Sequence, residues 1–161
     1  MPVIELKTII RAPIERCFLL SLSVDLHVLS TNGTNEKAIA GVTSGVMKMG
    51  DTVTWRAKHF GIYQKLSTKI SAYQSPNYFV DEMVKGAFKK IYHQHIFHPH
   101  SEGTFMTDLF DFEAPLGFIT NCILKNYMTK FLEQRNQTIK EIAEGDSWKK
   151  IIEREVVKII S

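Results

Sequence analysis

The middle of the chain alternates between apolar and polar residues with a period of two, the repeat of a β-strand. The alternation runs through residues 51–60, 61–73, 77–86, 88–98 and 104–114. Glycine, proline or asparagine stands in the breaks between these segments, and each break is short enough for a hairpin turn. The pattern predicts an antiparallel meander.

The chain before this meander predicts a strand, two short helices and one more strand. β-Branched residues dominate 3–11, and Pro13 both ends that strand and suits the first turn of a helix. Apolar residues follow at helical spacing from Ile14, and residues 23–29 predict a second short helix. A loop then leads to a short strand near residues 36–42.

After the meander the apolar spacing becomes helical, beginning at Pro115 and ending at Gly145. The predicted stripe consists of Leu116, Ile119, Ile123, Tyr127, Phe131, Ile139 and Ile142. A long amphipathic helix that follows a meander buries such a stripe against the concave face of the sheet. We therefore expect the sheet and this helix to close on each other.

Residues 146–161 repeat the helical spacing, with lysines and acids between the apolar positions. We divide the chain into a main domain, residues 1–145, and a C-terminal amphipathic extension, residues 146–161. The extension is expected to dock on the main domain or on a second copy of the chain. Binding to a membrane surface is the weaker alternative for so short a segment of mixed charge.

Charge and composition exclude several classes of function. The net charge of +3 is spread along the chain without a run of five like charges, so nothing recommends a nucleic-acid partner. No segment has the ~18 consecutive apolar residues of a membrane span, and the first residues do not resemble a secretory signal, so we expect a cytoplasmic protein. Cys17 and Cys122 lack a metal-binding spacing and predict two reduced thiols in the core.

The predicted order of elements over residues 3 to about 143 resembles the START-like (SRPBCC) superfamily, which includes pollen-allergen-like proteins, polyketide cyclases and lipid-transfer domains. Four runs look similar to a bacterial branch described as cyclase-like or cell-division-inhibitor-like: AGVTSG, GDTVTWRAKHFG, FVDEMVKGAFKKIYHQH and DLFDFEAPLG. The resemblance implies an α+β helix-grip fold, in which a curved antiparallel sheet of about seven strands (β-α-α-β6-α) wraps around the C-terminal helix. It also implies an internal cavity for lipids, hormones or polyketides, but it supplies no catalytic signature.

The residues that line this cavity have to be inferred from the alternation, which places the more apolar set of each strand inward. Ile62 belongs to that set, at the start of its strand. With two residues of the helix, the predicted ligand-binding set is Trp55, His59, Gln64, Leu66, Phe79, Asp81, Met83, His93, His95, Phe97, Asp108, Phe110, Ile123 and Tyr127. The predicted lining is aromatic and apolar, with an unusual share of polar groups.

Two of these histidines are predicted to face carboxylates. A hairpin between Pro99 and Thr104 places His95 directly across from Asp108. A turn at residues 86–88 likewise places His93 across from Asp81. We expect each histidine to gain a carboxylate partner, as buried polar groups require.

This polar cluster has several interpretations. The pairs could satisfy one another structurally, or they could fix the oxygen-bearing end of an otherwise apolar ligand. An imidazole oriented by Asp81 or Asp108 could also act as a general acid or base, which makes His93, His95 and these two acids the catalytic candidates if the protein is an enzyme. Metal binding by His93 and His95 lacks further ligands at a fixed spacing, so no metal is predicted.

The preferred hypothesis is a protein that binds or carries a small hydrophobic molecule, lipid-like or polyketide-like, without a cofactor and without assigned chemistry. The alternative is an enzyme of the cyclase or dehydratase type. In either case we expect a monomer or homodimer without integral membrane association.

Overall fold

A computed structural model describes residues 2–161 and contains one antiparallel seven-stranded sheet. Its strands are β1 (Val3–Ile10), β2 (Lys37–Gly41), β3 (Thr52–His59), β4 (Ile62–Gln74), β5 (Tyr78–Lys85), β6 (Lys90–His100) and β7 (Gly103–Glu113). Their order in the sheet is β1-β7-β6-β5-β4-β3-β2, so β2 to β7 form the meander and β1 adds to its far edge beside β7. This arrangement confirms the predicted fold class.

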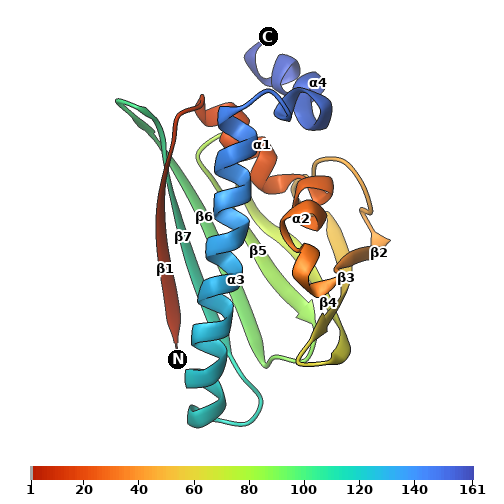
Figure 1. The fold of residues 1–161 in the computed structure, drawn as a ribbon. Helices are drawn as coiled ribbons and strands as arrows, with labels where there is room; N and C mark the ends of the chain where they lie inside the picture. The colour runs from red at the N-terminus through yellow and green to blue at the C-terminus, as the bar shows by residue number, and fades with distance from the viewer. Residues whose placement is uncertain (1) are drawn as a thin grey trace.

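The helices lie on one side of this sheet (Figure 1). They are α1 (Ile14–Leu22), α2 (Val24–Ser30), α3 (Phe118–Glu144) and α4 (Trp148–Ile160), with a 3-10 turn at Asn32–Thr34. Ser23 separates the first two helices, and its hydroxyl accepts a hydrogen bond from the Leu26 amide at 3.1 Å, which caps α2. The long α3 runs across the concave face, with α1 and α2 beside it.

The predicted inward faces are largely those of the structure. Burial alternates residue by residue along β6 and β7, and in β3 Val53, Trp55 and Ala57 are buried. Ile62 is an exception, because 65% of its surface is exposed. It directly follows the turn between β3 and β4, at the end of the sheet, so its apolar side chain lies at an edge of the domain.

The main core lies between α1, the C-terminal half of α3 and the centre of the sheet. Phe18 of α1 is fully buried and makes edge-to-face contacts with the rings of Phe79 and Phe97, at centroid distances of 5.7 and 5.6 Å. Ile139 of α3 belongs to the same cluster. This packing fixes one end of α3 on the sheet.

The other end of α3 differs from the prediction. The helix begins at Phe118 rather than at Pro115, because Gly117 has a positive φ of 87° that stops the helical backbone there. Leu116 and Ile119, which were assigned to the buried stripe, are 82% and 75% exposed. Cys122 is exposed as well, so only Cys17 is a core thiol. The helical period continues into this region, although its first apolar side chains remain exposed.

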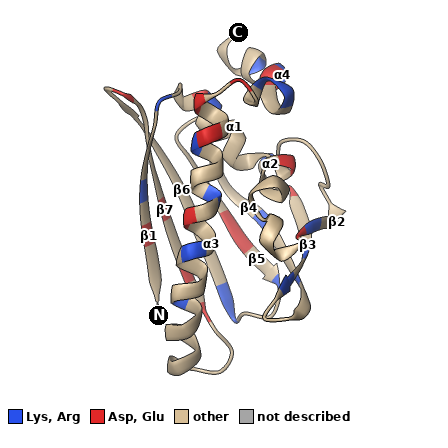
Figure 2. Cartoon of the chain, viewed as in Figure 1, with Lys and Arg blue, Asp and Glu red and all other residues tan. Residues whose placement is uncertain are grey.

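The last helix packs against α1. Ile152 is 1% exposed and belongs to the main core, and the guanidinium of Arg16 lies 3.9 Å from the ring centroid of Trp148. Both signs of charge are interspersed along α4 and over the sheet (Figure 2). In the described part of the chain, no helix combines the length and the apolar character needed to cross a membrane.

Candidate functional site: a cavity between the sheet and the long helix

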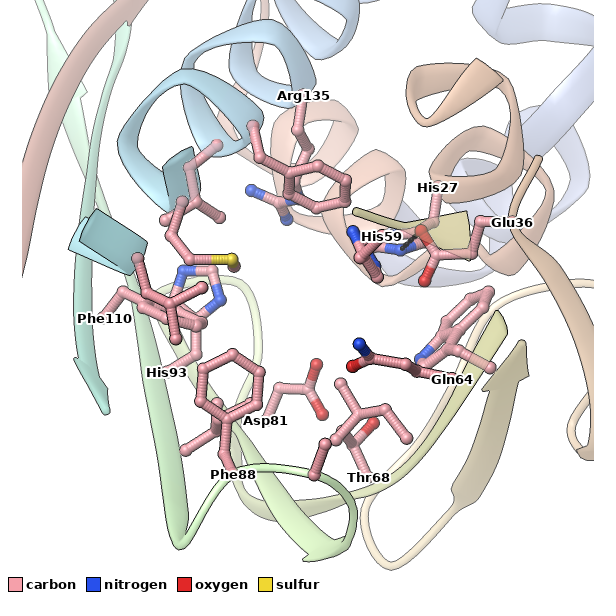
Figure 3. A pocket seen from close by; sticks show the side chains of 18 of the residues that line it. His27, Glu36, His59, Gln64, Thr68, Asp81, Phe88, His93, Phe110 and Arg135 are labelled. Carbon is pink, nitrogen blue, oxygen red and sulfur yellow. Dashed lines mark ion pairs between the residues drawn. The ribbon is translucent and has the colours of Figure 1, made fainter. Parts of the chain in front are cut away.

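A cavity of about 400 Å³ lies between the concave face of the sheet, α2 and the N-terminal half of α3. It lies beyond the main core, because Ile139 of α3 is fully buried in that core whereas Ile123, Tyr127 and Phe131 of the same helix line the cavity. Apolar side chains supply most of its wall. Figure 3 shows the polar side chains that point into it.

Most of the predicted ligand-binding residues line this cavity. They are Trp55, His59, Gln64, Leu66, Phe79, Asp81, His93, His95, Phe110, Ile123 and Tyr127. Met83, Phe97 and Asp108 are not part of the lining. Phe97 is fully buried in the main core, Met83 packs in a second apolar cluster, and Asp108 lies behind the two histidines.

Asp108 is the centre of a buried polar network. The His93 Nε2 and His95 Nδ1 atoms lie 2.9 and 3.1 Å from Asp108 Oδ1, and a carboxylate can only accept hydrogen bonds from them. On the opposite side Asn136 donates to Oδ2 at 2.7 Å, and the Arg135 guanidinium lies 3.4 Å from Oδ1. Every one of these side chains is less than 10% exposed, so the network is buried.

The network controls the charge of its members. Burial alone would raise the pKa of Asp108, but the hydrogen bonds from His93 and His95 and the positive charge of Arg135 outweigh it and hold that pKa well below its usual value. Burial, together with His93 and Arg135, keeps the pKa of His95 well below its usual value of 6.5. Near neutral pH the network therefore contains an ionised Asp108, a neutral His95 and a charged Arg135.

The predicted pairing of each histidine with its own carboxylate is only partly confirmed. His95 lies directly across from Asp108, and His93 lies across from Asp81, as the hairpins predict. Both histidines nevertheless turn to Asp108, and His93 makes no hydrogen bond to Asp81. Strand register determines which residues are opposite, whereas the side-chain rotamers determine which of them meet.

Arg135 and Asn136 are absent from the predicted set. They stand on the buried face of α3 with Leu132, Ile139 and Ala143, at the helical spacing of a core stripe. The sequence does contain a signal for them. Two polar residues interrupt an apolar helical stripe, and a strand of the same chain carries a carboxylate that is predicted to be buried.

The opposite wall of the cavity carries a histidine and a carboxylate that lie close together. His27 Nε2 of α2 lies 3.3 Å from the Glu36 carboxylate, and the His27 ring lies 4.2 Å from the ring of Trp55. Burial alone would raise the pKa of Glu36, but His27 outweighs it and lowers that pKa. Glu36 is absent from the predicted set, because it stands at the start of the short predicted strand near residues 36–42, where weak alternation assigns no face.

A contact between β3 and α3 crosses one edge of the cavity. The Tyr127 hydroxyl lies 2.6 Å from His59 Nδ1, and the Phe60 ring lies 4.7 Å from the Tyr127 ring. Burial lowers the pKa of His59 and raises that of Tyr127, which favours the neutral form of each. A neutral hydrogen bond therefore links the end of β3 to the long helix.

The floor of the cavity carries polar atoms of a different kind. Asp81 Oδ1 on β5 and Thr68 Oγ1 on β4 are buried, and neither has a hydrogen-bond partner among residues 2–161. Thr68 is only 3% exposed. In Figure 3 both side chains point into the cavity, beside Gln64.

The His93, His95 and Asp108 side chains also form a triad whose potential ligand atoms lie within 4.8 Å of one another. The two histidine nitrogens already bond directly to Asp108, and the charged guanidinium of Arg135 lies 3.4 Å from the same oxygen. Because a cation would have to displace these bonds beside an existing positive charge, the geometry favours a hydrogen-bonded network over a metal centre.

Solved structures share this arrangement of sheet and helices. The chain is similar to a protein of Thermus thermophilus, with 15% identity and a TM-score of 0.71 over 87% of this chain and 95% of that one. It is similar to ginseng major latex-like protein 151 from Panax ginseng, with 17% identity and a TM-score of 0.65 over 89% and 98% of the two chains. It is also similar to Ara h 8.0201, with 14% identity and a TM-score of 0.60 over 86% of this chain and 97% of that one.

The chain has the helix-grip fold. No protein-family model matches it. A search of curated proteins also gives no match. The helix-grip fold is thus shared at identities below one fifth, where the relatives define the architecture but not the residues of the cavity.

Proposed function

We propose that the protein binds a small, largely apolar molecule in the helix-grip cavity. The observation that carries this proposal is the cavity itself, about 400 Å³ of space lined mainly by aliphatic and aromatic side chains with a few polar groups at defined places. Ligand sites in proteins have this size and this mixture. The fold supports the proposal, because helix-grip proteins typically bind hydrophobic ligands.

The proposal is tested by filling the cavity. Leu66 is partly buried in the lining, whereas Lys69 on the same strand is exposed on the other face of the sheet. Leu66→Trp adds a large ring to the cavity, and Lys69→Trp adds the same ring to the outer surface. We expect Leu66→Trp to weaken binding of the neutral fluorescent probe N-phenyl-1-naphthylamine at least about tenfold, and Lys69→Trp to leave it unchanged.

Native mass spectrometry of freshly purified protein, followed by extraction, would identify any natural ligand. A stoichiometric apolar molecule that the Leu66→Trp protein no longer retains would support the proposal. Equal probe binding by both tryptophan variants would place the probe outside the cavity and contradict it.

A second candidate function is catalysis by a histidine that Asp108 orients. It is favoured by one observation, that the His93 and His95 rings line the cavity while Asp108 holds one nitrogen of each. A cyclase or dehydratase would convert the extracted ligand or a precursor into a product of different mass or retention time. His95→Gln would abolish that conversion while ligand binding persists, whereas a carrier would return its ligand unchanged.

A further inference from the structure

The floor of the cavity is the only place in its described lining where a carboxylate oxygen and a neighbouring hydroxyl are both buried without a partner. In the network, Asp108 accepts bonds from His93, His95 and Asn136. On the opposite wall, Glu36 Oε2 also lacks a hydrogen bond, but it lies 3.3 Å from His27 Nε2. Asp81 and Thr68 have no such partner.

The sheet places these two residues next to each other. Thr68 is opposite Met83 and Ile70 is opposite Asp81, so Thr68 and Asp81 are diagonal neighbours on the same inward face. Diagonal neighbours on adjacent strands lie about 7–8 Å apart at the backbone, which leaves room for one polar group between the two side chains. Figure 3 shows both side chains directed into the open cavity.

A buried polar atom without a hydrogen bond is costly, and native proteins seldom keep one. An ionised carboxylate only accepts hydrogen bonds, and the threonine hydroxyl can accept one as well. The partner that Asp81 lacks is therefore a hydrogen-bond donor, and the Thr68 hydroxyl can accept a hydrogen bond from the same group. No side chain of the described residues supplies it at Asp81 Oδ1 or Thr68 Oγ1.

We propose that the cavity selects apolar molecules that end in a hydrogen-bond donor, a hydroxyl or a protonated amine, and that Asp81 and Thr68 bind this end. The inference rests on the proposed function, because it names the chemical class of the ligand for the same cavity. A ligand that ends in a carboxylate is disfavoured, since its charge would meet that of Asp81 in an apolar surrounding.

The test compares three probes with the same chain and different ends: decan-1-ol, decylamine and decanoic acid, near neutral pH. Binding is measured by calorimetry or by displacement of N-phenyl-1-naphthylamine from the full-length protein. The variants are Asp81→Asn and, as a matched control, Glu82→Gln, which makes the same change at the next residue on the exposed face of β5.

We expect the wild-type protein to prefer decylamine and decan-1-ol over decanoic acid. Asp81→Asn should weaken decylamine binding about tenfold to a hundredfold, the range for loss of a charge-assisted hydrogen bond, and should affect decan-1-ol less because the amide oxygen still accepts. It should also strengthen decanoic acid binding, because the new amide can donate to a carboxylate. Glu82→Gln should change none of the three.

Opposite changes for the amine and the acid cannot come from a misfolded variant, since misfolding would weaken all three probes together. Thr68→Val, which removes the hydroxyl but keeps the shape, should weaken decan-1-ol binding several-fold and provides a second, independent variant. If all three probes bind and Asp81→Asn changes none of them, this inference fails and the proposed function stands. If none of the probes binds to the wild-type protein, or if all of them bind equally well to the Leu66→Trp protein, both fail.

Discussion

Asp108 and Asp81 stand on the inward faces of neighbouring parts of the same sheet, yet their surroundings are opposite. Asp108 is fully buried and surrounded by donors from one strand, β6, and from α3, whereas Asp81 is partly buried and its Oδ1 has no donor. The first carboxylate belongs to the buried network that joins α3 to the sheet. The second faces space that a ligand can occupy. We therefore expect the presence or absence of protein partners to distinguish structural polar groups of this cavity from groups that recognise a ligand.

The largest expected effect is on the free energy of unfolding, and it tests whether Asp108 and Asp81 differ in role. Asp108→Ala should lower the free energy of unfolding by about 3–5 kcal/mol, because it leaves the Arg135 guanidinium buried without its carboxylate. Asp81→Asn should change that free energy by less than about 1 kcal/mol in the absence of ligand, since it breaks no hydrogen bond of Oδ1. Urea unfolding of the three proteins measures both values. Equal losses for the two variants would show that the two carboxylates do not differ in role.

A smaller effect concerns pH. Because the pKa of His95 in the folded protein lies well below 6.5, the unfolded chain binds one more proton than the folded protein as the pH falls through 6.5. Stability contributed by the neutral His95 is therefore complete above this pH and declines below it, by up to about 1.4 kcal/mol per pH unit. The lowered pKa of Asp108 acts only below its ordinary value of 3.8, so it does not contribute to this window.

The measurement is the free energy of unfolding between pH 7 and pH 5. His95→Gln should flatten the decline, leaving the part that His59 adds through its own lowered pKa. His98→Gln, at an exposed position of the same strand, is the control and should keep the wild-type slope. A slope unchanged in His95→Gln would mean that this histidine is not held neutral by the network.

The smallest expected effect is a difference in unfolding free energy between variants of two buried threonines. The Thr104 hydroxyl donates to the Ala12 carbonyl at 2.8 Å, whereas the Thr68 hydroxyl oxygen has no partner in the described structure. Thr104→Val should cost about 1 kcal/mol of unfolding free energy, and Thr68→Val about 0.5 kcal/mol or less. Chemical denaturation resolves this difference when the two variants are measured side by side. A larger loss at Thr68 would mean that its hydroxyl is already satisfied, which would remove a premise of the donor-recognition proposal.

The sheet was predictable because its information is local. A period of two assigns faces, and short turns assign register, so the position of His95 across from Asp108 follows from the sequence alone. The cluster around Asp108 was only half predictable, because Arg135 and Asn136 arrive from α3, and polar residues on a helix ordinarily face solvent.

The N-terminal half of α3 shows a different limit. Its apolar spacing continues unbroken from the buried half, so periodicity extends the stripe to Leu116 and Ile119. Whether such a stripe is buried depends on how closely the sheet approaches the helix, and the sequence of the helix does not contain that information. The resemblance of the sequence to a known superfamily implies a cavity. Which polar atoms of that cavity lack hydrogen-bond partners depends on the packing of distant segments, so the sequence does not indicate it.

The positions of the two tryptophans provide a built-in optical reporter. Trp55 is 6% exposed in the cavity wall, with the His27 ring 4.2 Å away, whereas Trp148 lies on α4 against Arg16. Trp148→Phe keeps an aromatic face for Arg16 and leaves a single indole, placed where a ligand would arrive. The intrinsic emission of that variant would then follow the entry of unlabelled molecules in real time, without a dye that competes for the same space.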